Sequence, residues 1–287
     1  MLADFVEDIV ELSGMRRSEV VPTPRWLSDY LQEPIVLEGL ARLEQDRHAV
    51  EMTAALFEDQ RIVPLETDAS GWSALLLTIN KEASSICTAA GAAVVHVLEA
   101  GGDLTFNQCQ VEGVDSFHDI PAGARLGSRT SFAVRPGDTF VVPQDMQAIL
   151  LEGTSTRVKL LRFNGPVAAP ISLAFDPGTG RMMSSSFSES GATGRHFFSI
   201  LLSELTRTTL GSENVIPAKE RERMADLIDQ IWSDDVHAYT RWRLVQVMAR
   251  LRPASAIARL KAMASQDLPN LSRHALAALT KASGVEA

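Results

Sequence analysis

The sequence predicts an α+β chain in which a central antiparallel β-barrel or sandwich is flanked by helical segments. Three observations support this fold class. The first 60 residues are rich in Leu, Ala, Glu and Arg. The middle of the chain alternates short apolar runs with turns that contain Gly and Pro. The last part, residues 195–287, again has the apolar periodicity of helices.

The N-terminal helical segment is expected to span residues 1–60, with a break at Pro34. The opening has no basic stretch of the kind that begins a secretory signal, and no apolar run approaches the ~18 residues of a membrane span. Two cysteines, Cys87 and Cys109, are too few for a disulfide framework. We therefore expect a cytoplasmic protein with no membrane partner.

The β region is expected to span residues 61–187, where short strands recur at a spacing of roughly 8–12 residues. Its last part, "ISLAFDPGTGRMMSSSF" (residues 171–187), is typical of a hairpin that closes at Pro177 and Gly178. The following "SESGATG" (residues 188–194) has the composition of a linker, so we predict that it separates the barrel from the C-terminal helices.

Residues 195–287 are expected to form a helical domain that repeats itself. "TRWRLVQVMARL" aligns with "SRHALAALTKAS" at an offset of 32 residues, and this part of the chain, about residues 236–283, resembles HEAT repeats. In the first of the two segments, Arg243 and Arg250 are expected to face outward. The same helix should bury an apolar stripe made of Leu244, Val247, Met248 and Leu251.

Charge is unevenly distributed along the chain, whose net charge is −9. Residues 236–287 contain eight Lys or Arg against two acidic residues, which gives +6, whereas the preceding residues contain 19 basic and 34 acidic residues, which gives −15. Either the basic tail complements the acidic remainder, or it binds an anionic partner such as nucleic acid.

Two stretches of the β region, "VVHVLEAGG" and "RPGDTFVVP", resemble the two sequence motifs of the cupin superfamily, and the resemblance covers about residues 72–165. Cupins hold a metal with three His and one Glu. The resemblance places the paired His near Ile86–Thr88 or Cys87–Ala89, the Glu near Ala93, and the last His at Gln147 or Ala148.

None of these positions holds a ligand of the expected type, so the resemblance implies a barrel without the family's metal. We predict no metal and no cofactor, and purified protein without stoichiometric iron, zinc, manganese or nickel. A non-standard metal site made of His96, His118 and Glu152 is the alternative.

Four residues of the barrel are candidate ligand-binding groups: His96, Asn107, Gln147 and Arg162. His96 lies mid-strand, where a histidine is either a hydrogen-bonded core residue or a ligand. Asn107 shares a strand face with Cys109. This face either lines a pocket or faces solvent. Gln147 could form hydrogen bonds where the resemblance places a metal ligand.

Arg162 shares a strand face with Val158 and Leu160. If this face points inward, Arg162 places a cation at the barrel rim, where it suits a carboxylate or phosphate; the other interpretation is a surface salt bridge. The residues around Gln147 are mostly apolar. We therefore expect a closed or narrow interior, with any ligand at the rim near Arg162.

These patterns favour a binding or accessory protein without catalytic residues. The barrel would act as a scaffold or small-anion sensor, and the helical part would present a surface to a protein partner or a second copy of the chain. The alternative is a metal-independent enzyme (an epimerase, isomerase or lyase) acting on a small anion, for which His96 with Arg162 or Glu152 is the base–acid pair on offer. Nucleic-acid binding through the basic helices is a second alternative, and less expected.

Overall fold

The computed structural model describes residues 2–14, 20–45, 60–79, 86–88, 91–101, 104–142, 147–153, 158–166, 168–187, 190–210, 217–233 and 235–283. The chain divides into two units. The β unit comprises Met1–Glu112 and Arg125–Ser185, and the helical unit comprises Gly113–Ala124 and Ser186–Ala287. The division cuts across the three predicted segments, because the N-terminal helices belong with the sheets and loop 113–124 belongs with the C-terminal helices.

The β unit begins with four short elements: the 3-10 helix Leu2–Asp4, α1 (Val6–Ser13), α2 (Arg25–Tyr30) and α3 (Pro34–Gln45). The strands are β1 (Val20–Val21), β2 (Gln60–Thr67), β3 (Ser73–Ile79), β4 (Ile86–Thr88), β5 (Ala93–Ala100), β6 (Leu104–Glu112), β7 (Arg125–Val134), β8 (Thr139–Val142), β9 (Gln147–Gly153), β10 (Val158–Asn164), β11 (Ile171–Phe175) and β12 (Met182–Phe187). The N-terminal segment was expected to be helical, yet it also supplies strand β1.

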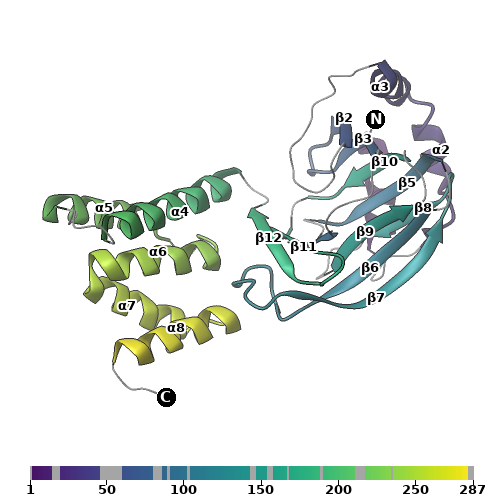
Figure 1. Cartoon of the computed structure of the whole chain (residues 1–287). Helices are drawn as coiled ribbons and strands as arrows, with labels where there is room; N and C mark the ends of the chain where they lie inside the picture. Colours follow the sequence, from purple (N-terminus) through teal and green to yellow (C-terminus); the bar gives the residue numbers. More distant parts are fainter. Residues whose placement is uncertain are drawn as a thin grey trace. The chain divides into compact units, whose positions relative to one another are not determined.

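These strands form two six-stranded sheets (Figure 1). Sheet A has the order β1-β8-β5-β10-β3-β2, and sheet B has the order β12-β11-β4-β9-β6-β7. The neighbouring strands pair in antiparallel fashion. An antiparallel β region followed by a helical part is the α+β fold that the sequence predicts.

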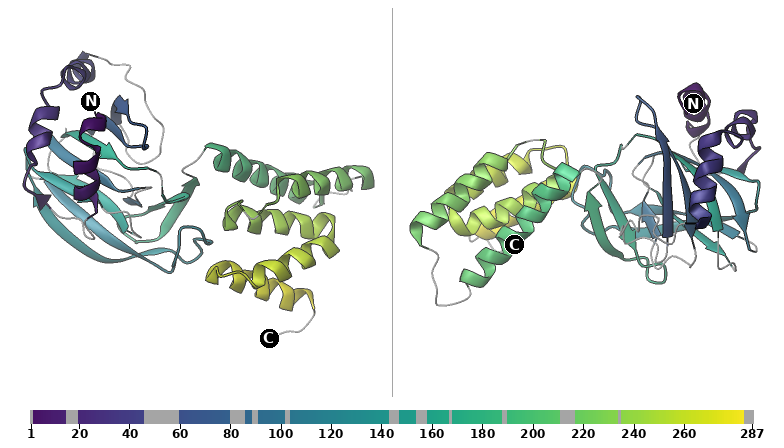
Figure 2. Two further views of the ribbon diagram at one scale, coloured as in Figure 1. Left: turned by 180° about the vertical axis from the view of Figure 1, so that it is seen from behind. Right: turned by 90° about the horizontal axis from the view of Figure 1, so that it is seen from above.

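Sheet A is buried on both faces. One face joins residues of sheet B, such as Phe106, in a core between the sheets. The other face packs against the N-terminal helices, which Figure 2 shows in purple along one side of the strands. This double burial explains why β3 and β5 are nearly continuous apolar runs instead of alternating ones. Each fully buried Leu, Val or Phe contributes roughly 1.5–3 kcal/mol relative to an exposed one.

Aromatic residues anchor the N-terminal helices to sheet A. The rings of Trp26 and Tyr30 lie 5.4 and 5.2 Å from that of Phe163 on β10. The Tyr30 hydroxyl donates a 2.9 Å hydrogen bond to Oε1 of Glu66 on β2. Burial, together with this carboxylate, raises the pKa of Tyr30. The buried hydroxyl group therefore has a hydrogen-bond partner. Its desolvation does not cancel the free energy gained by burying the ring.

Two sequence-predicted turns join consecutive strands: "RPGD" leads from β7 of sheet B to β8 of sheet A, and the second turn closes the pair β11 and β12. In "RPGD", the Arg135 N–H donates to Oδ2 of Asp138 at 2.7 Å, and Gly137 adopts φ +91°, a conformation that suits glycine. The predicted hairpin over residues 171–187 is confirmed, because β11 and β12 are neighbours in sheet B. Its turn includes Gly180 at φ +67°.

The helical unit contains α4 (Ser190–Leu210), α5 (Ala218–Ile231), α6 (Ala238–Leu251), α7 (Pro253–Ala264) and α8 (Pro269–Ala282). Figure 1 shows α6, α7 and α8 packed in succession. The predicted stripe of α6 is buried as expected, since Leu244, Val247 and Met248 have no exposed surface. The two segments related by the 32-residue offset are both helical, but the resemblance to HEAT repeats stays a prediction. Within the described part of the chain, no helix is long and apolar enough to cross a membrane.

Two expectations about the helical part are corrected. Residues 190–194 of the expected linker form the first turns of α4, because Leu202 further along this helix is buried in the core and tertiary packing outweighs the weak helix propensity of Ser, Gly and Thr. Arg250 is exposed, but Arg243 is half-buried: its guanidinium lies 5.1 Å from the ring centre of Tyr239 and donates to the Tyr239 hydroxyl at 3.0 Å.

The loop Gly113–Ala124 is bound to the helices by its backbone and by one buried carboxylate. Asp119 accepts hydrogen bonds from the N–H groups of Asn270 (2.7 Å) and Leu271 (2.9 Å) at the start of α8. It also accepts from the N–H of Ile120 at 2.7 Å. Nε2 of His237, the N-cap of α6, lies 2.7 Å from the carbonyl oxygen of Phe117. Asp119 thus caps a helix about 150 residues away in sequence.

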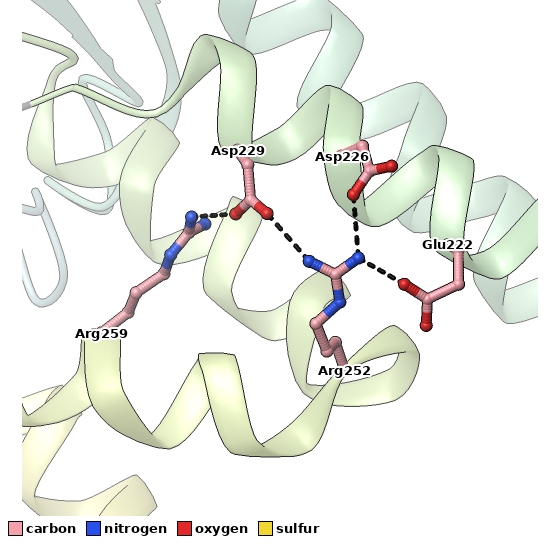
Figure 3. A network of polar contacts seen from close by, with 5 residues as sticks. All are labelled: Glu222, Asp226, Asp229, Arg252 and Arg259. Atoms are coloured by element: carbon pink, nitrogen blue, oxygen red, sulfur yellow. Dashed lines mark hydrogen bonds and ion pairs between the residues drawn. The ribbon is translucent and has the colours of Figure 1, made fainter.

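Surface charges connect α5 to α7 (Figure 3). Arg252 donates to Oδ2 of Asp229 at 3.0 Å and to Oδ1 of Asp226 at 2.8 Å, and it also pairs with Glu222. Arg259 pairs with the other oxygen of Asp229. Two cations of the basic tail are therefore engaged by acidic residues of the same unit.

Candidate functional site

Strand β10 presents two different faces, and Arg162 lies on the face that points toward sheet B. Leu161 belongs to the core beneath the N-terminal helices, whereas Leu160 belongs to the core between the sheets. Because side chains alternate along a strand, Arg162 shares the face of Leu160. Its register partners are Leu75 on β3 and Val95 on β5, which also belong to the inner face.

The guanidinium of Arg162 has no counter-ion among the described residues. Its Nε is buried without a hydrogen-bond partner, while the residue as a whole is half-buried. Burial lowers the pKa of Arg162 from its ordinary value, since the charged form is poorly solvated. By contrast Lys159, three residues earlier on β10, is almost fully buried but forms a 2.9 Å ion pair with Glu99.

Two neutral polar residues accompany Arg162 on the inner face of sheet A. Asn164 follows Arg162 by two positions, and its register partners are Ser73 on β3 and Ala93 on β5. Asn164 and Ser73 are half-buried. With the other described residues, neither forms a side-chain hydrogen bond. Three polar side chains without internal partners therefore meet where β10 ends and β3 begins.

The structure places His96 away from this site. His96 pairs with Leu161, so its side chain points to the face of sheet A beneath the N-terminal segment. Nδ1 of His96 lies 3.0 Å from Oγ1 of Thr139. Burial lowers the pKa of His96, and the nearby charge of Asp138 partly opposes this shift. His96 is a hydrogen-bonded buried histidine, which is one of the two interpretations that the sequence left open.

Asn107 also lies elsewhere. It alternates with Phe106, which belongs to the core between the sheets, so Asn107 points to the opposite face of β6. Its Oδ1 accepts hydrogen bonds from Nε of Arg129 at 2.9 Å and from Oγ of Ser131 at 2.6 Å. Gln147 begins β9 opposite Gln110, and its side chain lies outside the described part of the chain. Of the predicted ligand residues, His96 and Asn107 are thus not brought to Arg162, and Gln147 stays a prediction.

Two of the segments in which the resemblance places metal ligands, β4 and the start of β9, are neighbours in sheet B, and the residues described there are not metal ligands of the expected type. Strand β4 pairs with β9 so that Thr88 faces Ala148. The Thr88 hydroxyl accepts a 2.9 Å hydrogen bond from the Leu173 N–H. Among the described residues, no three His, Cys, Asp or Glu side chains form a cluster that could hold a metal ion.

The alternative metal site of His96, His118 and Glu152 gains no support from the structure. His96 belongs to the β unit and His118 to the helical unit. The side chain of Glu152 lies outside the described residues.

Sequence reasoning found Arg162 but missed Asn164 and Ser73. The alternation of Arg162 and Asn164 in "RFN" was available as a signal, because residues two apart share a strand face. Ser73 could not be found in this way. Its place beside Asn164 depends on the register between β3 and β10.

No model of a known protein family matches the chain, and no curated protein sequence matches it. The solved structures similar to it include the cupin domain of Schizosaccharomyces pombe Cnp3, at 12% identity and a TM-score of 0.27 over 39% of this chain and 67% of that one. A cupin-like protein of Thermotoga maritima aligns at 9% identity and a TM-score of 0.29, over 47% of this chain and 80% of that one. HEPD from Streptomyces albus aligns at 13% identity and a TM-score of 0.27 over 38% of this chain, but this covers only 22% of HEPD. The structural neighbours of this chain are cupin-fold proteins at low sequence identity.

Proposed function

We propose that the chain is a non-enzymatic binding protein. Its β unit binds a small anion at Arg162, and its helical unit presents a surface for a protein partner. The observation that supports the first part is the guanidinium of Arg162, which lies on the inner face of sheet A with a buried Nε and no partner among the described residues.

A half-buried cation without a counter-ion is unfavourable for stability to the extent that its apolar surroundings remove hydration and replace it with nothing, as they do at the buried Nε of Arg162. A bound anion would supply both the missing charge and the missing hydrogen-bond acceptors. The planar guanidinium can bind the two oxygens of one anion through parallel N–H groups. Ligand binding therefore gives a reason for this residue that packing does not.

A thermal-shift screen tests the proposal. Acetate, sulfate and inorganic phosphate are compared at fixed ionic strength, so that screening of surface charges is the same throughout. At least one anion should raise the melting temperature of the unaltered protein, and Arg162→Ala should abolish this rise. Arg181→Ala, which removes an exposed arginine of the same unit, should leave it intact.

Gln147→Ala should matter little, because the proposed contact is with Arg162. The proposal fails if no anion stabilises the protein. It also fails if the rise depends on Gln147 or His96 and not on Arg162, since the ligand would then bind elsewhere in the β unit.

The second part of the proposal is supported by an apolar stripe on α4. Phe197, Leu201 and Leu205 follow each other at four-residue intervals and are 60%, 46% and 54% exposed. Large apolar side chains gathered on one helix face are typical of protein-interaction sites. Sedimentation velocity tests whether a second copy is the partner: association that rises with concentration and is lost in Leu201→Glu supports a homodimer, and a monomer at every concentration excludes it.

Two alternative functions have less support. An enzyme using His96 with Arg162 would need both groups at one substrate, yet they lie on opposite faces of sheet A. Nucleic-acid binding would use the cations of the C-terminal helices; Arg252 and Arg259 are paired with acidic residues of α5, which leaves exposed residues such as Arg250, Lys261 and Lys281. Neither alternative is favoured by a specific contact.

A further inference from the structure

Among the described side chains, Arg162 is the cation on the inner face of sheet A. Lys159, the other buried cation of β10, points to the opposite face and is paired with Glu99. The carboxylate of Glu66 on β2 accepts from Tyr30, beneath the N-terminal helices. Arg162 is therefore left to interact with one unit of negative charge. In a poorly solvated site, a monoanion would leave the pair neutral, whereas a dianion such as sulfate would leave an uncompensated charge.

The neighbours of Arg162 define what else a ligand would meet. The cross-strand partners of Arg162 are the apolar residues Leu75 on β3 and Val95 on β5. Along β10, Leu160 lies two residues earlier on the same face. Two residues further along β10, Asn164 and its cross-strand partner Ser73 supply neutral hydrogen-bonding groups. The site thus combines one cation, two neutral polar side chains and apolar neighbours.

From this arrangement we infer that the ligand of the Arg162 site is a monocarboxylate with an apolar body. The inference rests on the proposed function and narrows it from small anions in general to one class. The carboxylate binds Arg162 through two parallel hydrogen bonds, as guanidinium groups bind carboxylates elsewhere. The apolar body contacts Leu75, which is half-buried beside Arg162, and a polar substituent next to the carboxylate can reach Asn164 or Ser73.

Isothermal titration calorimetry with matched probes tests this inference. Butyrate and benzoate are compared with their uncharged amides, and with sulfate and inorganic phosphate, at one ionic strength and pH. The carboxylates should bind at least tenfold more tightly than sulfate or phosphate, and the amides should not bind measurably. Acetate is titrated as well, as a carboxylate with almost no apolar body. Tighter binding of benzoate than of acetate would reflect contact with the apolar neighbours.

Three variants link the affinity to the site. Arg162→Met keeps much of the side-chain volume without the charge and should lose at least tenfold in carboxylate affinity. Arg162→Lys keeps the charge but not the planar pair of donors, so it should retain part of the affinity. Arg181→Ala should bind as the unaltered protein does. Far-UV circular dichroism confirms that each variant is folded.

The possible failures are distinguishable. If sulfate or phosphate binds more tightly than the carboxylates and Arg162→Met removes that binding, the anion site exists and the assignment to monocarboxylates is wrong. If no anion binds, or if binding is unchanged in Arg162→Met, the proposed function itself is wrong.

Discussion

Arg252 of the helical unit and Arg162 of the β unit have the same guanidinium group in opposite surroundings. Arg252 lies at the surface and pairs with three carboxylates of α5, whereas Arg162 lies at the inner face of a sheet and has no counter-ion among the described residues. Arg252 has protein partners, whereas Arg162, whose Nε is buried, has none among the described residues. Ion pairing accounts for the first arginine, and we propose that anion binding accounts for the second.

The comparison also applies to buried polar groups. Asp119 in the helical unit is buried, and three backbone N–H groups donate to it. Lys159 in the β unit is buried and paired with Glu99. Arg162 differs from Asp119 and Lys159 in having no counter-ion among the described residues, although single buried guanidinium nitrogens without a partner also occur in Arg221, Arg243 and Arg259. The predictions below test this difference.

The largest change in the free energy of unfolding is expected for a substitution in the core of the helical unit. Leu244→Ala should lower the free energy of unfolding of this unit by about 2–5 kcal/mol, because Leu244 has no exposed surface and its removal leaves a cavity. Urea unfolding followed by circular dichroism measures the change. Leu276→Ala on α8 is the matched control, since Leu276 is 55% exposed and should cost far less.

Removing a satisfied buried charge should also be damaging. Asp119→Ala leaves three backbone N–H groups without their acceptor and should destabilise the helical unit by about 2–3 kcal/mol. Hydrogen exchange should quicken at the amides of Asn270 and Leu271. Asp115→Ala, in the exposed part of the same loop, should change neither quantity. Unchanged exchange in Asp119→Ala would show that the loop does not depend on this cap.

Removing the charge of Arg162, which has no counter-ion among the described residues, should change the free energy of unfolding in the opposite direction. Without ligand, Arg162→Leu should raise the free energy of unfolding of the β unit by about 1 kcal/mol, because an apolar side chain replaces a half-buried cation whose buried Nε lacks a partner. Urea unfolding of the two proteins in parallel measures the difference. A loss of stability would mean that Arg162 has an internal partner, and the contrast with Arg252 would disappear.

Acid should weaken the helical unit through its buried histidines. Burial lowers the pKa of His196 from 6.5 to about 4, with the charges of Arg243 and His237 adding to the shift. The pKa of His237 is lowered too, by burial and then by the charges of His118 and Arg241, while Phe117 and Asp119 oppose the shift. Since the unfolded chain binds these protons more readily, the stabilisation is complete above pH 6.5 and is lost as the pH falls toward 4.

The loss at pH 6 should be about 0.5 kcal/mol for His196, allowing for solvent screening. Thermal unfolding between pH 7.5 and 5 measures it, at values chosen to span the ordinary histidine pKa of about 6.5. In His196→Gln the decline should be smaller. The same decline in both proteins would place the responsible proton at another residue.

The smallest effect is expected for the surface network of Figure 3. Arg252→Ala should lower the melting temperature slightly at low salt, because exposed ion pairs are screened by water. The difference from the unaltered protein should vanish near 1 M NaCl, where the screening length is about 3 Å. A large loss that persists in high salt would show that Arg252 acts through packing rather than charge.

Local sequence patterns determined much of this architecture. The two-residue alternation placed Val158, Leu160 and Arg162 on one face of β10, which the structure shows to be the inner face, and the four-residue spacing around Leu244 identified the buried face of α6. Turn chemistry located the hairpin after Phe175. These predictions succeeded because each depends on residues that are close in sequence, where backbone geometry alone decides which side chains share a face.

Only the tertiary structure decided which residues meet. His96 and Arg162 both lie in strands of one sheet, and the register of β5 against β10 puts them on opposite faces. The pairing of β3 with β10 brings Ser73 to Asn164, and the folding of loop 113–124 brings Asp119 to the start of α8. Strand register and helix capping at a distance are set by the packing of whole elements, because the free energy gained from burying the cores outweighs any local preference of these side chains.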